Sequence, residues 1–320
     1  MAGNEASRGE LLAATAISGM ALSLPALFAE LAWLQVLTPL PAQYYATLYG
    51  WKTGGTVVLA AAGLAGAVTT ATGDWPALLF SLIMMPLGFI LARAGKKGSL
   101  MGAVGMGLVF LVLAWGGVAG LFSALSRLNP YQELVGFASQ GLDATLALYR
   151  DSGRFTAEDL KAITAFVERI KEQVVRLMPG LLTIAPIATV WLNIVAGQWL
   201  LKKRDPELAA WGDLSQWRLP DLLVWPVIAA GALLVIPERG LNTIGLNLGL
   251  VMAALYASQG LAIVSHLLNR WSAGKAMRLL VYGLLFIEAH GLLLVAALGL
   301  ADVWADFRRR WNQREEEPAG

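Results

Sequence analysis

Long uninterrupted apolar runs are the feature of this sequence that most restricts its fold. A helix needs about 20 mostly apolar residues to cross the hydrocarbon core of a bilayer. Candidate runs lie at 11–34, 54–72, 75–93, 99–124, 178–201, 221–236, 242–268 and 277–305. A shorter run, 36–50, holds two prolines and is expected to form a tilted, broken or re-entrant segment. The sequence therefore predicts an all-α polytopic integral membrane protein with eight or nine transmembrane helices.

The composition points to the same class and excludes several functions. The chain is 57% hydrophobic and 14% charged, whereas soluble domains carry about 25% charged residues. A net charge of +2 gives no strong field for nucleic acid. The chain has no cysteine and two histidines, which excludes thiol catalysis, thiolate metal sites and a histidine-rich metal centre. We therefore expect no cofactor, no metal and no nucleic-acid partner, and a lipid bilayer as the surroundings.

The segment WRLPDLLVWP (217–226) has the features of a chain entering a bilayer. Trp217 and Arg218 suit the headgroup level. Pro220 is expected to start a helix, where its missing N–H costs nothing, and Asp221 then faces the positive end of the helix dipole. Tryptophans near the predicted span ends form an aromatic belt, namely Trp33, Trp51, Trp75, Trp199, Trp217, Trp271 and Trp304.

The distribution of basic residues predicts the sides of the membrane. The first run lacks a basic leader and is longer than a signal-peptide core, so it is expected to be a retained span. Basic clusters at 93–97, 202–218 and 270–278 fit the cytoplasm together with the N-terminus. The basic residues 308–310 would then lie outside, against the rule. Either the run 221–236 re-enters without crossing, or the last run breaks near His290–Gly291.

Residues 125–177 are predicted to form an amphipathic helical hairpin whose second arm runs on into the 178–201 span. Asn129 before Pro130 predicts the start of one helix, and Thr156 with Asp159 predicts the start of another. Two interpretations stay open: a cap packed on the membrane domain, or a gate or partner-docking element. The expected organisation is N-terminal membrane helices (1–124), the hairpin (125–177), C-terminal membrane helices (178–310) and a disordered tail (311–320).

Polar side chains inside the apolar runs are the candidate ligand-binding residues, because an unpaired polar group is costly in hydrocarbon. The candidates are Asn193, Asn247, Tyr256, Gln259, Glu288 and His290. Spacing places Tyr256, Gln259 and His266 on one helix face. Glu288, the deepest carboxylate, is interpreted either as a ligand contact or proton carrier, or as a paired interhelical residue. Asp302, near Trp304, is interpreted as structural.

Known catalytic motifs are absent. The sequence contains no G-x-x-x-x-G-K-[ST], no G-x-S-x-G and no H-E-x-x-H pattern. We therefore expect a protein that is not an enzyme, that has no catalytic residues and that carries no ATPase of its own.

The order of several segments resembles the YybS-like family of bacterial multi-pass membrane proteins. The resemblance rests on TPLPAQYYATLYGWKTG (38–54), WRLPDLLVWP (217–226), GLNLGLVMAALYASQGLAIVSHLL (245–268, with a lead from 240) and LGLADVWADFRRR (298–310). It implies a bacterial inner membrane and a core similar to the substrate-binding subunits of energy-coupling-factor transporters and to the rod-shape protein MreD. It supplies no catalytic residues. The hairpin and the extra spans depart from those transporter subunits.

Three functions follow as hypotheses. The first is a small-molecule binding or transport-associated membrane subunit that depends on a separate ATPase. The second is a non-transporting scaffold for cell-envelope or division proteins. The third, an enzyme acting on a lipid-linked substrate through Glu30, Asp74 or Glu288, is disfavoured because spacing brings no two of these carboxylates together.

Overall fold

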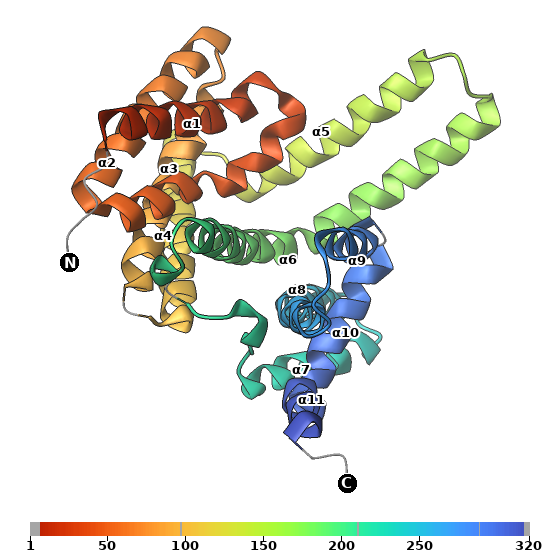
Figure 1. The fold of residues 1–320 in the computed structure, drawn as a ribbon. Coiled ribbons are helices and arrows are strands. Elements are labelled where there is room, and N and C mark those ends of the chain that lie inside the picture. The colour runs from red at the N-terminus through yellow and green to blue at the C-terminus, as the bar shows by residue number, and fades with distance from the viewer. Residues whose placement is uncertain (1–6, 97, 210, 288, 317–320) are drawn as a thin grey trace. The chain divides into compact units, whose positions relative to one another are not determined.

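Helices form nearly the whole chain. The computed structural model describes residues 7–96, 98–209, 211–287 and 289–316, and within these ranges it contains no β-strand. Contacts divide the chain into two units, Met1–Leu121 with Ala185–Gly212 and Phe122–Ile184 with Asp213–Gly320. The long helix α6 (Ala157–Arg204) contributes residues to both units (Figure 1). The all-α fold class is confirmed.

The first unit is built from α1 (Arg8–Leu27), η1 (Ala29–Leu37), α2 (Pro39–Thr72), α3 (Trp75–Gly95), most of α4 (Leu100–Ser126), the C-terminal part of α6 and η2 (Pro206–Leu208). Its apolar centre is formed by small and medium side chains of α1, α2 and α3, among them Leu22, Ala61 and Met85. Arg204 at the end of α6 lies 3.3 Å from Glu10 at the start of α1. This pair places the two helix ends together, as their assignment to one side of the membrane requires.

A sharp break divides α2. Gly50 has φ 79° and ψ 174°, a conformation that strongly favours glycine. A Cβ atom at Gly54 would lie 2.5 Å from the Tyr45 carbonyl oxygen, so the two arms of α2 fold back closely on each other. The predicted broken segment 36–50 therefore exists, and it precedes a second helical arm.

The second unit contains α5 (Pro130–Asp151), the N-terminal part of α6, η3 (Leu214–Gln216), η4 (Asp221–Leu223), α7 (Val224–Val235), α8 (Arg239–Arg270), α9 (Lys275–Ile287), α10 (Ala289–Ala305) and α11 (Phe307–Glu316). Leu219, Tyr256 and Ala296 form its buried apolar cluster. Gly260 and Gly299 allow the close contact of α8 and α10.

The hairpin has the helix starts that its sequence predicts. Asn129 accepts hydrogen bonds from the backbone N–H groups of Tyr131 and Gln132, which caps α5. Thr156 and Asp159 form the reciprocal contacts that start α6, which then continues to Arg204. Figure 1 shows α5 and the beginning of α6 running side by side as a long pair.

The number of helices able to cross a membrane is smaller than predicted. Within the described ranges, six helices are long and apolar enough, or seven if α9 and α10 together form one bent span. The runs 36–50 and 54–72 fall in one helical stretch, Glu30–Thr72. In the run 221–236 the α-helix is α7, which has only 12 residues, because the first three residues of the run form the 3-10 helix η4.

The last apolar run breaks near His290, as one of the two topologies left open by the sequence requires, and the short helix α7 is compatible with the other. The segments Lys275–Ile287 and His290–Ala305 are bent by 104° relative to each other. Trp311 in α11 stacks on His266 near the end of α8, with ring centroids 6.4 Å apart. The start of α11, which carries the basic residues 308–310, therefore lies near the end of α8, and the side of the membrane on which it lies stays a prediction.

Candidate functional site

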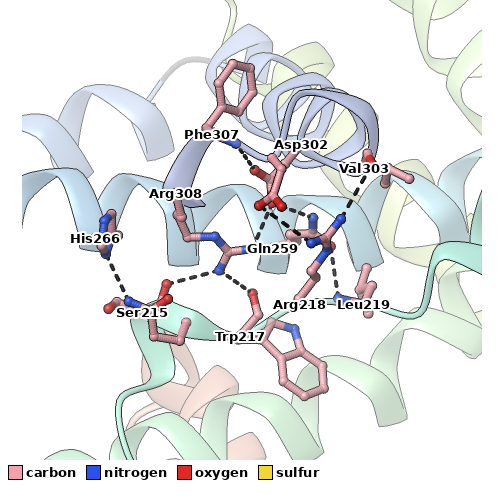
Figure 2. Close-up of polar contacts among 12 residues, drawn as sticks. Ser215, Trp217, Arg218, Leu219, Gln259, His266, Asp302, Val303, Phe307 and Arg308 are labelled. Atoms are coloured by element: carbon pink, nitrogen blue, oxygen red, sulfur yellow. Dashed lines mark hydrogen bonds and ion pairs between the residues drawn. The ribbon is translucent and has the colours of Figure 1, made fainter. Parts of the chain in front are cut away.

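A buried polar network ties the C-terminal helices of the second unit together (Figure 2). Asp302 on α10 is fully buried and accepts a 2.8 Å hydrogen bond from Arg308, whose side chain is 7% exposed. The second guanidinium nitrogen of Arg308 donates to the carbonyl oxygens of Ser215 and Trp217. The other carboxylate oxygen of Asp302 accepts from the Phe307 N–H at the start of α11. This ion pair therefore holds α11 and the segment before α7 against α10.

Gln259, a predicted ligand-binding residue, belongs to this network. Its Nε2 donates to Asp302 over 3.1 Å, and its Oε1 accepts from the Leu219 N–H over 3.0 Å (Figure 2). Tyr256, one turn earlier, is buried, and its hydroxyl has no hydrogen-bond partner among the described groups. His266 contacts Gln216 over 3.2 Å. The predicted common face of α8 is confirmed, and most of it contacts the segment 213–223.

Asn247, a second predicted ligand-binding residue, forms hydrogen bonds to α6 where the regular hydrogen bonding of that helix is interrupted. Pro179 has no N–H, so the helix cannot continue its regular hydrogen bonds there. The Asn247 side chain accepts from the Gly180 N–H over 2.6 Å and donates to the Arg176 carbonyl oxygen over 2.9 Å. The Tyr131 hydroxyl donates to the carbonyl of Val175, the acceptor that Pro179 leaves unpaired. Both the oxygen and the nitrogen of the Asn247 side-chain amide are thus hydrogen-bonded within the protein.

The other predicted ligand-binding residues lie elsewhere. Asn193 belongs to the first unit, where its buried Nδ2 donates to the Val36 and Thr189 carbonyl oxygens. His290 has an exposed side chain at the start of α10. Glu288 lies outside the described residues. The structure therefore brings Tyr256 and Gln259 together and distributes the others, and a ligand-binding role for each of the six stays a prediction.

A cavity in the first unit was not anticipated from the sequence. Its volume is about 450 Å³, and it lies between the N-terminal arm of α2, the end of α3 and the end of α6. Leu91, Ala92, Gly95 and Leu201 form buried walls. A cavity of this size lies within the usual range for small-molecule sites, about 300–1,000 Å³.

Gln43 is the unusual lining residue of this cavity. Its side chain is 1% exposed, and neither amide atom has a hydrogen-bond partner within the described chain. Gly88 and Gly197 make room for it, because a Cβ at Gly197 would lie 2.6 Å from the Gln43 Cδ and one at Gly88 would lie 2.7 Å from the Ala42 Cβ. A buried amide without partners costs about 1–3 kcal/mol per unsatisfied group. Three helices therefore hold an unsatisfied donor and acceptor at a fixed position.

The remaining polar groups of the cavity differ between its interior and its rim. Thr47 lies one turn after Gln43, and the indole N–H of Trp211 is buried without an acceptor among the residues the structure describes. Lys96 and Glu207 line the cavity with exposed side chains of opposite charge. The Gln43 amide and the Trp211 indole N–H thus lie buried behind the cavity surface, the Thr47 hydroxyl donates to the Gln43 carbonyl oxygen, and a cation and an anion lie at the rim. No metal-ligating group of three or more acidic or histidine side chains occurs in the described residues.

The sequence does not single out Gln43, because this residue lies outside the long apolar runs in which an unpaired polar side chain is costly. Gln43 lies in the short proline-containing run, and its burial depends on the fold-back at Gly50 and on two glycines far away in sequence. One signal was present in the sequence: a lone amide beside two prolines in an otherwise apolar and aromatic segment.

Comparison with known proteins identifies the class of this chain. Residues 13–303 match the family described as "Predicted membrane protein (DUF2232)", and the chain belongs to this family. It is therefore a membrane protein with several apolar helices. No curated protein and no solved structure matches the chain.

Proposed function

We propose that this member of the family is a bacterial inner-membrane subunit that binds a small polar molecule in the cavity of the first unit and supports its transport. The unsatisfied Gln43 amide carries the proposal. A buried polar group without partners is costly in a membrane domain, and a ligand that supplies both hydrogen bonds removes that cost. The absence of a P-loop in the sequence assigns energy coupling to a separate ATPase.

The cavity also indicates the chemistry of its ligand. A primary amide presents a donor and an acceptor side by side, and it pairs in two-point fashion with a carboxamide, a lactam or a nucleobase edge. Lys96 and Glu207 at the rim suit an uncharged or zwitterionic molecule better than a strongly charged one. The cavity, its walls and the absence of catalytic motifs favour binding over catalysis. The resemblance to energy-coupling-factor substrate-binding subunits supports the same interpretation.

Substitution of Gln43 tests this proposal. The protein is extracted in mild detergent, and small molecules that co-elute are identified by mass spectrometry for the wild type, Gln43→Leu and Gln140→Leu. Gln140 is exposed in the hairpin and serves as a control of matched chemistry. We expect one compound in stoichiometric amount with the wild type and the control, and its loss from Gln43→Leu. Identical small-molecule profiles for all three proteins would contradict the proposal.

A scaffold for cell-envelope or division proteins is the second candidate, and it has its own observation. The hairpin exposes large apolar side chains, including Phe137 at 77%, Leu148 at 73% and Phe166 at 62%. This exposure suits docking of a membrane protein partner. Phe137→Glu should then remove specific proteins from an affinity purification, whereas Gln140→Glu on the same helix should not. An unchanged set of co-purified proteins would count against the scaffold.

A further inference from the structure

A shallow groove lies along α10 on the second unit. Its volume is about 580 Å³, and it is lined by Ala297, Leu300, Ala301, Trp304, Ala305 and Arg310. Five of these residues lie on α10, and Arg310 lies on the polar helix α11. The groove therefore has an apolar length and a single cationic end.

We propose that this groove binds an anionic phospholipid, with an acyl chain along α10 and the phosphate at Arg310. From Ala297 to Ala305 the helix rises about 12 Å. That length is close to the hydrocarbon thickness of one leaflet, about 15 Å, which is half of the core. The small side chains at 297, 301 and 305 leave room for a chain on this face of α10.

Trp304 marks the depth of the groove in the membrane. Its side chain is 65% exposed and lies at the cationic end of the groove. Exposed indoles gather at the headgroup level, and the charged sequence of α11 begins directly after it. Arg310 is thus held at the depth of the lipid phosphate.

The charges around the groove favour an anion at Arg310. Asp302 is paired with Arg308, and Asp306 lies 3.6 Å from Arg218, so both nearby carboxylates are engaged by other arginines. Arg310 is exposed and has no ion pair in the part of the chain that the structure describes. Arg309 is equally exposed but does not line the groove. Of these three consecutive arginines, Arg308 is structural, Arg310 lines the groove, and Arg309 is a matched control.

Lipid retention tests the proposal. The full-length protein is reconstituted in nanodiscs of phosphatidylethanolamine and phosphatidylglycerol, then released and analysed for bound lipid by native mass spectrometry. We expect the wild type to retain phosphatidylglycerol in preference to phosphatidylethanolamine. Arg310→Gln should weaken that retention about five-fold, the factor equivalent to the ~1 kcal/mol that one basic residue contributes near an anionic surface. Arg309→Gln should leave it close to the wild-type value.

A second variant tests the apolar part of the groove. Ala301→Phe fills it without changing charge and should also reduce retention of phosphatidylglycerol. Equal retention of the two lipids by the wild type would overturn the proposal. Equal losses in Arg309→Gln and Arg310→Gln would also overturn it, because only the general positive charge would then matter. Should Ala301→Phe fail to fold, the two arginine variants still decide the question.

Discussion

Breaking the Asp302–Arg308 pair is the perturbation with the clearest expected magnitude. Asp302 is fully buried, and the Arg308 side chain is 7% exposed. Removing one partner of a buried pair leaves a charge without compensation and costs about 3–5 kcal/mol. Asp302→Leu also removes the cap on Phe307 and the acceptor of Gln259. We therefore expect this variant to lose ~4 kcal/mol of its free energy of unfolding.

A double-mutant cycle separates the pair from the packing around it. Unfolding of the wild type, Asp302→Leu, Arg308→Met and the double variant is followed in mixed micelles with increasing denaturant. Apolar residues of similar volume can replace a buried ion pair at little cost, so the double variant should regain most of the stability that either single variant loses. The assignment of this pair as a buried, stabilising ion pair would be refuted if the losses of unfolding free energy in the two single variants simply added in the double variant. A loss below ~1 kcal/mol for Asp302→Leu would refute it as well.

Three further predictions concern helix contacts. Gly299→Ala should destabilise the protein by ~1–3 kcal/mol, because the new Cβ would lie 2.8 Å from the Gly260 nitrogen. Gly283→Ala is the control: its Cβ meets open space, so this variant should be neutral or stabilising in a thermal melt. Asn247→Leu should cost ~2–4 kcal/mol by leaving the Gly180 N–H and a carbonyl of α6 unpaired, measured by denaturant unfolding. The backbone N–H groups of Leu241 and Gly240 hold the pKa of Glu238 below its ordinary value. The stabilisation from this carboxylate is therefore complete above the ordinary pKa and is lost as the pH falls through the lowered pKa. The melting temperature of Glu238→Gln should accordingly depend less on pH in this acidic range than that of the wild type.

The sequence predicts well those features that depend on local chemistry. The cap at Asn129 and the Thr156–Asp159 start of α6 appear in the structure, whereas Pro220 precedes only the short 3-10 helix η4 and α7 begins at Val224. Six of the seven tryptophans of the predicted belt have exposed side chains, namely Trp33, Trp51, Trp75, Trp199, Trp271 and Trp304, and their place at the membrane interface stays a prediction. These features succeed because each is determined by a few neighbouring residues or by the boundary between lipid and water.

Features that depend on distant contacts could not be predicted. Asp302 was expected to be structural, but its burial against Arg308 could not be predicted. The contact depends on the backbone break at Asp306, where φ is 43°, because this break turns Arg308 back toward α10. The hydrogen bonds of Asn247 to α6 could not be predicted either, because the sequence does not show that the interruption at Pro179 lies beside it. An intramembrane amide can serve a ligand or a broken helix, and only the arrangement of the helices distinguishes the two.

Cysteine labelling shows directly whether a small molecule occupies the cavity of the first unit. The chain has no cysteine, so Thr47→Cys places a single thiol in the cavity lining and Thr56→Cys places one at an exposed position of the second arm of α2. Maleimide labelling of both is timed in dialysed membranes, with and without the dialysable fraction of a bacterial lysate. We expect this fraction to slow labelling at position 47 alone. Equal rates at position 47 in both conditions would contradict a small-molecule site there.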